Sequence, residues 1–220
     1  MGYSIDPISD NCYPGTTVLI NKLDIRDEQT LNEAETLATY INASKLEEQP
    51  LEGVFDFAHY KAIHHFLFSD LYDWAGQIRT VNISKKGTRC CLIEEIEDRA
   101  ALIFDRLKEQ GYFRGLRHDA FTDEIVDLYC ATNDLHPFRE GNGRTQRAFL
   151  TQLIRNAGYD IHWSEVEVDL LMIATIQAAN GVTDLLKDVF FHMAISNQRA
   201  HHTAKQRLYQ CSKALLIICS

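Results

Sequence analysis

Apolar residues recur every three or four positions along most of this chain, with polar residues between them. Leu31, Ala34 and Ala38 form one such stripe. Spacing of this kind places apolar side chains on one face of an α-helix. The pattern therefore predicts a mainly α-helical fold, with helices over residues 21–43, 55–74, 96–110, 121–135, from 144 onward, 164–179 and 183–195. Asp56 is a suitable cap for the second helix, and Gly76 is a suitable stop after it.

Residues 78–83 and 89–93 alternate instead between apolar and polar side chains, and they are the only convincing strand-forming segments. A turn over 85–88, which contains Gly87, joins them, so we expect a β-hairpin. Two interpretations of this hairpin stay open. It is either a surface hairpin without a role or an edge to which an extended peptide of another protein adds as a further strand.

Composition narrows the classes of function. A length of 220 residues fits one domain with small extensions. The net charge of −9 argues against broad binding of nucleic acid or of acidic membranes. The six cysteines include no CxxC pair and no zinc-like spacing, which favours reduced thiols and a cytoplasmic location. Residues 1–15 lack the features of a signal peptide, and no apolar run is long enough to span a bilayer.

The segment 136–147, HPFREGNGRTQR, carries the strongest chemical signal. Pro137 disfavours the helical conformation at His136, so the helix over 121–135 should stop there. Arg144 and Arg147 share one face near the start of the next helix, where the macrodipole disfavours cations unless an anion is present. With glycine-rich backbone beside them, these arginines predict a site for a polyphosphate and its metal. The alternative is a plain connection between helices with solvated arginines.

These residues resemble a known family. The segment matches the Fic motif HPFxx[GA]NGRxxR at every fixed position, and 55–79, Tyr13-Pro14-Gly15 and Asn180-Gly181 are similar to bacterial Fic proteins of the small toxin type. The resemblance implies one Fic-type helical domain over 21–195 with a small β-hairpin flap at about 78–93. An irregular arm would occupy 1–20, and a tail or marginal helix 196–220. It also implies a protein adenylyltransferase that moves AMP from Mg-ATP to a Ser, Thr or Tyr hydroxyl of a target protein.

Each residue of the motif has a role that its chemistry suits. His136 is the side chain with a pKa suited to a general base. Glu140 is best interpreted as the Mg²⁺ ligand, because Mg²⁺ keeps waters and takes other ligands from phosphates. Phe138 should anchor the loop to the core. The expected nucleotide-binding residues are Gly141, Asn142 and Gly143 for the α-phosphate, and Arg144 and Arg147 for the β- and γ-phosphates.

The flap assignment comes from the resemblance alone. In Fic proteins this hairpin holds the target segment by strand addition over the active site. The corresponding residues here are Ile83, Lys85, Gly87, Thr88 and Cys90. Where the family often carries an aromatic residue in the second flap strand, this chain has Cys90 and Cys91.

The resemblance also bears on how the expected activity is inhibited. Fic proteins are commonly inhibited by a helix bearing [ST]xxxE[GN], whose glutamate pairs with the motif's second arginine, here Arg147. The only comparable spacing is Ser44…Glu48, and Gln49 follows it. We therefore expect that a separate small antitoxin supplies the inhibitory glutamate. Oligomeric state is left open by the sequence.

Two other functions stay open beside AMP transfer. One is transfer of another phosphate-containing group on the same fold, and the other is a non-catalytic protein-binding module. His59, His64 and His65 have no partners at metal spacing, and we expect them, like Tyr72 and Trp74, to serve in packing.

Overall fold

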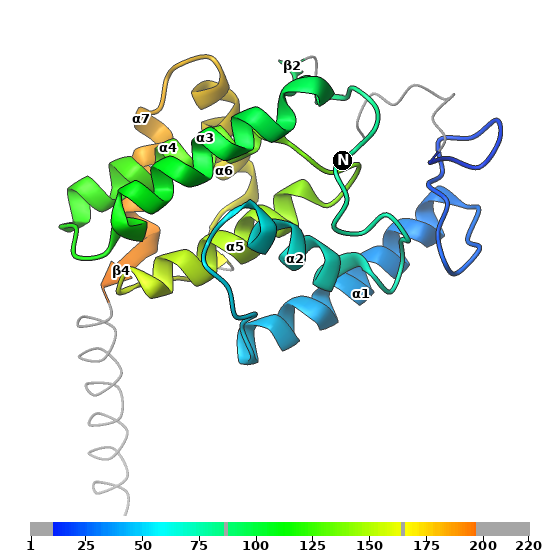
Figure 1. The fold of residues 1–220 in the computed structure, drawn as a ribbon, viewed down its shortest axis with the longest axis horizontal. Helices are drawn as coiled ribbons and strands as arrows, with labels where there is room; N and C mark the ends of the chain where they lie inside the picture. Colours follow the sequence, from blue (N-terminus) through cyan, green and yellow to red (C-terminus); the bar gives the residue numbers. More distant parts are fainter. Residues whose placement is uncertain (1–10, 86–87, 164–165, 197–220) are drawn as a thin grey trace, which may run out of the picture. The chain divides into compact units, whose positions relative to one another are not determined.

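The computed structural model describes residues 11–85, 88–163 and 166–196 of the chain. The mainly helical fold expected from the sequence is confirmed (Figure 1). The helices are α1 (Glu28–Glu48), α2 (Phe57–Phe68), α3 (Ile96–Glu109), α4 (His118–Leu135), α5 (Asn142–Asn156), α6 (Val168–Ala179) and α7 (Asp184–Met193), with short 3-10 turns at Ile93–Glu95 and Gly111–Phe113. The strands are β1 (Ser84–Lys85), β2 (Thr88–Arg89), β3 (Tyr159–Ile161) and β4 (Ala194–Ser196).

Helix α1 begins seven residues later than the sequence pattern predicts, at Glu28 rather than at Asn21. The reason is local hydrogen bonding. The Asn21 side chain accepts from the amides of Leu23 and Ile25 and donates to the Leu19 carbonyl, which holds a turn instead of a helix. Asp27 is the actual cap, and α1 continues beyond the predicted end at 43 until Gln49.

Helix α2 has the expected cap but ends early. The Asp56 carboxylate accepts from the His59 amide at 2.7 Å, as predicted. The helix stops at Phe68 rather than at 74. The chain then turns back on it, so that the Ala75 carbonyl and the Gly76 amide contact the rings of His65 and His64. Gly76 has a φ of +81°, and a side chain there would lie 2.9 Å from the Cβ of His65. The turn therefore needs glycine at this position.

The expected hairpin is present but short. Strands β1 and β2 pair antiparallel through Ser84↔Arg89 and Lys85↔Thr88. The other described residues of 78–93 are irregular, apart from the 3-10 turn that begins at Ile93. The Asn82 side chain accepts from the Ile93 amide, which takes the place of ladder bonding there. The view that 78–93 holds the only strand material was wrong, because β3 and β4 also pair antiparallel. Three-residue strands so far apart in sequence give no periodic signal.

The chain forms two compact units. The first contains the residues up to Tyr112 together with Leu128–Gln152, and the second contains Phe113–Asp127 and the residues from Leu153 onward. Helices α4 and α5 contribute residues to both. The division into arm, domain and tail at residues 20 and 195 stays a prediction, and residues 1–10 and 197–220 lie outside the described part.

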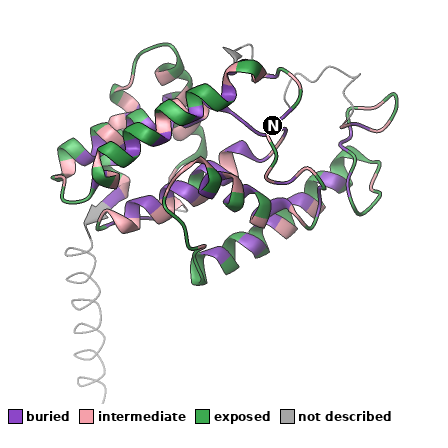
Figure 2. Cartoon of the chain, in the orientation of Figure 1, coloured by how far each residue is buried: buried purple, intermediate pink, exposed green. Residues whose placement is uncertain are grey.

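Aromatic side chains fill the core of the first unit. Tyr60 stacks on Phe138 with ring centroids 5.7 Å apart, and Phe149 meets Tyr60 edge to face at 5.2 Å. All three are fully buried. Figure 2 shows that buried and exposed residues alternate along the helices. Because Phe138 belongs to the motif segment, the core anchors that loop, as predicted.

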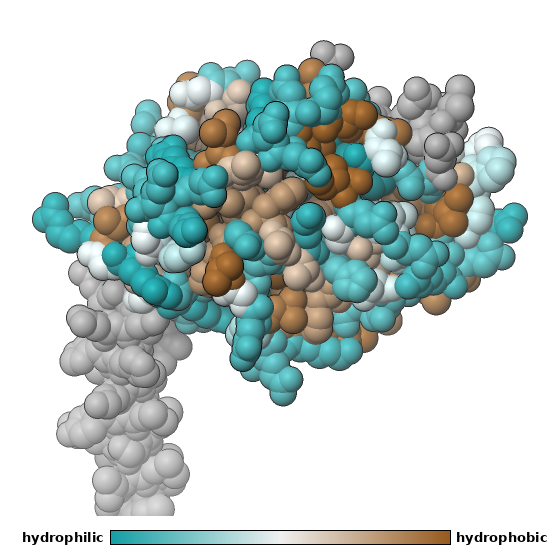
Figure 3. All heavy atoms as spheres, in the orientation of Figure 1, coloured by the Kyte–Doolittle hydropathy of each residue, from teal (hydrophilic) through white to brown (hydrophobic). Residues whose placement is uncertain are grey.

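The face of the molecule in Figure 3 is largely hydrophilic with separate hydrophobic patches. In the part of the chain that the structure describes, none of the helices combines the length and the apolar character that crossing a membrane requires.

Candidate functional site

His136 lies directly after α4, where the chain leaves the helix with an unusual backbone conformation. Its φ is +43°, a value that non-glycine residues rarely adopt. The residue is 2% exposed. Its ring Nδ1 lies 2.9 Å from the Asn133 carbonyl oxygen, so Nδ1 carries the proton that is donated there. This tautomer puts the lone pair on Nε2, which is the nitrogen that a general base would use.

Arg79 holds the backbone of His136 in place. Its Nε donates to the His136 carbonyl at 2.9 Å, and its backbone amide donates to the Pro137 carbonyl at 2.9 Å. The same guanidinium donates to the carbonyls of Val81 and Cys91, next to the flap hairpin. Arg79 is 4% exposed, and burial lowers the pKa of its guanidinium. One buried arginine thus joins the base of the flap to the candidate general base.

The motif loop closes on itself through Asn142. The Asn142 side chain accepts from the Phe138 amide at 2.9 Å and donates to the Phe138 carbonyl at 2.8 Å. These two bonds commit the Asn142 side chain to closing the loop, so its backbone amide is the group that we assign to a phosphate. Gly141 has a φ of +77°, and a Cβ there would lie 2.1 Å from the ring of Phe68. The loop needs glycine for both reasons.

Glu140 is mostly buried beside this turn. Its Oε1 accepts from the Gly141 amide at 2.7 Å and from Arg144 Nη2 at 3.3 Å. Burial raises the pKa of the Glu140 carboxyl, and the Gly141 amide opposes that shift. Since both contacts use Oε1, the second oxygen suits a hard cation that takes its remaining ligands from water and phosphate. The described residues contain no larger cluster of metal-ligating side chains.

His64 holds the backbone of Glu140 in place. Its Nε2 lies 3.0 Å from the Glu140 carbonyl oxygen, and its Nδ1 accepts from the Gly76 amide at 2.7 Å. The two partners require a neutral ring with the proton on Nε2. Burial lowers the pKa of His64 to about 4. The expectation that His64 serves in packing is confirmed, but it also positions the motif.

Arg144 projects from the first turn of α5 and is held by residues from two other helices and a turn. Its Nη2 forms an ion pair with Glu35 of α1, and its Nη1 donates to Thr39 at 3.3 Å. The Tyr72 hydroxyl donates to the other oxygen of Glu35 at 2.5 Å. The guanidinium carbon lies 4.8 Å from the ring centre of Phe68, a cation–π arrangement.

Arg147 lies one turn further along α5, and it differs from Arg144 in its surroundings. Its Nη1 would lie 3.4 Å from a Cβ at Gly143, so the guanidinium reaches back to the start of the helix. The residue is exposed, yet neighbouring atoms desolvate its guanidinium and lower the pKa. Among the described residues, no carboxylate forms an ion pair with Arg147. Glu48 is exposed at the far end of α1, about 20 Å along the axis from Glu35.

The predicted flap residues divide into three groups. Ile83 and Cys90 are buried, and the Cys90 amide donates to the Ile83 carbonyl at 3.3 Å. Lys85 and Thr88 pair with each other in the hairpin ladder. Gly87 lies outside the described residues. A peptide that pairs with this hairpin would therefore use backbone groups rather than the side chains of Ile83 or Cys90.

Sequence reasoning missed Arg79 and Glu35 as residues of the site. A signal for Glu35 was available, because it stands one helical turn after Leu31, within the buried stripe of α1. A carboxylate in such a stripe is almost never buried without a partner. Arg79 gave no comparable signal, because its partners are backbone carbonyls.

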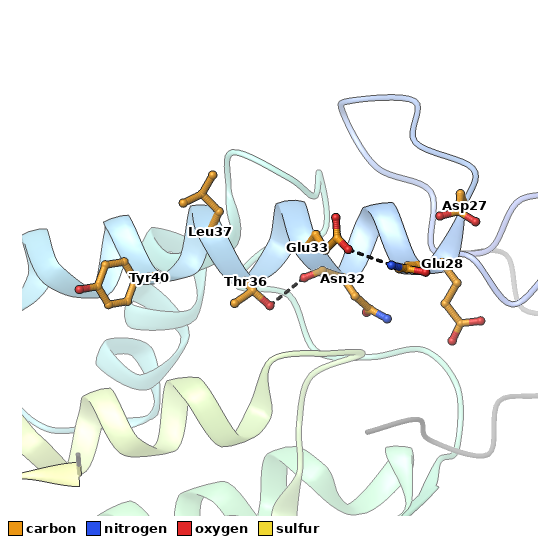
Figure 4. A pocket seen from close by; sticks show the side chains of 8 residues that line it. Asp27, Glu28, Asn32, Glu33, Thr36, Leu37 and Tyr40 are labelled. Carbon is orange, nitrogen blue, oxygen red and sulfur yellow. Dashed lines mark hydrogen bonds between the residues drawn. The ribbon is translucent and has the colours of Figure 1, made fainter. Parts of the chain in front are cut away.

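A shallow hollow also runs along α1, and Glu35 is not among its lining residues (Figure 4). Its lining includes Asp27, Glu28, Glu33, Leu37 and Tyr40 and no basic side chain. It therefore lacks the cations that a phosphate site requires, which the motif loop supplies.

Comparison with known proteins agrees with this geometry. The Fic/DOC family model matches residues 54–154. The probable protein adenylyltransferase Fic of Salmonella typhimurium is 38% identical over 187 residues, covering 85% of this chain and 92% of that protein. Protein adenylyltransferase VbhT of Bartonella schoenbuchensis is 39% identical over 83% of this chain, which spans only 38% of VbhT.

Solved structures are similar as well. The BepC protein of Bartonella tribocorum, with bound AMPPNP, superposes with a TM-score of 0.78 at 26% identity, over 85% of this chain and 97% of that one. A Fic domain from Bartonella quintana, with bound ADP, gives a TM-score of 0.77 at 27% identity, over 84% of this chain and 94% of that one. With a relative matched along nearly its whole length, this chain belongs to the Fic/DOC family.

Proposed function

We propose that this protein is a protein adenylyltransferase, which transfers AMP from ATP to a hydroxyl side chain of a target protein. One observation carries the proposal. His136 donates its Nδ1 proton to the Asn133 carbonyl, which leaves Nε2 as the basic nitrogen. The loop that follows it leads into the N-terminus of α5, which carries Arg144 and Arg147. Relatives named as protein adenylyltransferases and structures with bound AMPPNP or ADP support the same reaction class.

The reaction needs a base at the attacking hydroxyl. Nε2 of His136 takes the hydroxyl proton as the oxygen attacks the α-phosphorus of ATP. The new oxygen–phosphorus bond forms while the bond from the α-phosphorus to the bridging oxygen breaks, and pyrophosphate leaves. General-base assistance of this kind contributes on the order of 10²–10⁴ in rate.

The helix N-terminus stabilises the charge that develops. Backbone amides of Asn142 and Gly143 lie in the first turn of α5, where the intrahelical ladder provides no acceptors for them. Directed at the α-phosphate, they stabilise the transition state electrostatically. Arg144 and Arg147 hold the β- and γ-phosphates.

A magnesium ion fits Glu140, because its hydrogen bonds from the Gly141 amide and from Arg144 both use Oε1 and leave the second carboxylate oxygen available. When bound, Mg²⁺ would neutralise charge on the phosphates. Glu140 in turn is held by His64 through its carbonyl oxygen.

The target is presented by the flap. The backbone of a target segment pairs with the short hairpin at 84–89 and brings its hydroxyl toward His136. Arg79 supports this arrangement, because it contacts both the His136 carbonyl and the backbone beside the hairpin.

Inhibition comes from a separate small antitoxin protein that places a glutamate on Arg147. Two observations favour this. Arg147 forms no ion pair in the described part of the chain, and Glu48, the single internal candidate, is exposed. Expression of the chain alone should therefore arrest growth of the host. A large increase in AMP transfer after Glu48→Ala would refute a separate inhibitor.

Labelled ATP separates the proposed reaction from its alternatives. The protein is incubated with Mg²⁺, cell lysate and ATP labelled at the α- or the γ-phosphate. We expect protein labelling from α-labelled ATP, and its loss in His136→Ala. His192→Ala, which removes an exposed histidine, is the matched control and should keep wild-type labelling.

The other outcomes are equally decisive. Labelling from γ-labelled ATP alone would indicate phosphate transfer on the same fold. No labelling from either substrate, with wild-type nucleotide binding, would indicate a binding module and refute the proposal.

A further inference from the structure

We infer that Glu35 is a positioning residue that draws the Arg144 guanidinium toward itself, limits its contact with Glu140 to a weaker one, and so keeps the Glu140 carboxylate available to a metal ion. The inference rests on the proposed function, because it assigns Glu140 to the metal and Arg144 to phosphate. The observation that supports it is that two carboxylates, those of Glu35 and Glu140, contact the same nitrogen, Nη2 of Arg144.

The competition is unequal. The contact between Arg144 Nη2 and Glu35 is the shorter of the two, while the contact with Glu140 is 3.3 Å. Charge-assisted hydrogen bonds strengthen as they shorten, so Glu35 is the principal counter-ion of Arg144. Glu140 then makes only a secondary contact with the guanidinium.

Glu35 is itself fixed independently of Arg144. Its side chain is 8% exposed, and Tyr72 donates to its second oxygen at 2.5 Å. The Thr39 hydroxyl, which contacts Arg144 at 3.3 Å, donates to the Glu35 backbone carbonyl at 2.7 Å. Helix α1 and Tyr72 thus hold the Glu35 carboxylate in a fixed position beside Arg144.

The rest of the guanidinium stays usable for a phosphate. The contacts of Arg144 with protein groups use Nη1 and Nη2, whereas a guanidinium carries five N–H groups. This distinguishes Glu35 from an inhibitory glutamate, which would have to occupy the arginine fully and be removable. Glu35 is buried and bonded to Tyr72, so it is a constant part of the site.

Removing the charge of Glu35 should let Arg144 turn to Glu140. A closer Arg144–Glu140 ion pair would compete with Mg²⁺ for the carboxylate. The test is calorimetric titration of the whole protein with AMPPNP, once with Mg²⁺ and once with EDTA. For Glu35→Gln we expect roughly tenfold weaker binding with Mg²⁺, and no loss of affinity in EDTA.

Three further variants make the result specific. Glu33→Gln makes the same change of charge on the exposed face of α1 and should bind like the wild type. In an Arg144→Gln background, Glu35→Gln should have no further effect, whereas a general structural defect would persist there. Tyr72→Phe removes the anchor of Glu35 and should reproduce part of the Mg²⁺-dependent loss, even if Glu35→Gln fails to fold.

Several outcomes would overturn the inference. The inference fails if Glu35→Gln loses the same AMPPNP affinity with and without Mg²⁺, or if its binding is unchanged. It also fails if the variant binds more tightly and transfers AMP faster, because Glu35 would then be an inhibitor. Because the readout is equilibrium binding, it is distinct from the proposed reaction. A protein that shows the Mg²⁺-dependent loss but transfers no AMP would refute the proposed function alone.

Discussion

Acid should destabilise the native state through His64, the buried histidine that contacts the Glu140 carbonyl of the motif loop. The native ring is neutral, because Nδ1 accepts from Gly76 and burial lowers its pKa from 6.5 to about 4. In the unfolded chain the same ring binds a proton near pH 6.5. Between these two values the unfolded state holds more protons than the native state, so stability falls as the pH falls.

The magnitude follows from the two pKa values. Each pH unit within the window costs about 1.4 kcal/mol, and a window of roughly 2.5 units gives about 3.5 kcal/mol in total, of which about 3 kcal/mol is lost by pH 4. Above pH 6.5 this histidine contributes no pH dependence. Below about pH 4 the native ring is also protonated and its contribution levels off.

Urea unfolding of the wild type and of His64→Gln, followed by fluorescence without nucleotide or metal, measures this contribution. At pH 7.5 the difference in unfolding free energy gives the packing and hydrogen-bond cost of the substitution. That difference should shrink by about 3 kcal/mol as the pH is lowered to 4. Parallel stability curves for the two proteins would refute the assignment of His64 as a neutral buried group.

Three more substitutions test the loop and its supports. Gly141→Ala should lower AMP transfer at least tenfold, because its Cβ meets Phe68, whereas Gly15→Ala, with a similar φ of +74° and open space around it, should keep the wild-type rate. Arg79→Lys should lower the unfolding free energy by about 2 kcal/mol and speed amide hydrogen exchange in the flap, and unchanged exchange would contradict the link between flap and loop. Asp27→Ala should lower the urea concentration at the midpoint of unfolding, since it removes the cap of α1, and an unchanged midpoint would assign the cap no role.

Residues close together in the chain determined what the sequence could predict. The stop before Pro137, the glycine turn and the shared face of Arg144 and Arg147 depend on backbone sterics and helical periodicity over a few residues. The same is true of the Asp56 cap. The mainly helical fold and the residues that form the motif loop could therefore be predicted from the sequence alone.

Tertiary structure decided which groups these residues meet. Glu35 reaches Arg144 across more than a hundred residues of sequence, and Arg79 reaches the His136 carbonyl from the base of the flap. Periodicity reports which face of an element is buried, but it does not report what lies opposite that face. The ion pair, the positive φ of His136 and the pairing of β3 with β4 arise only when distant segments pack together.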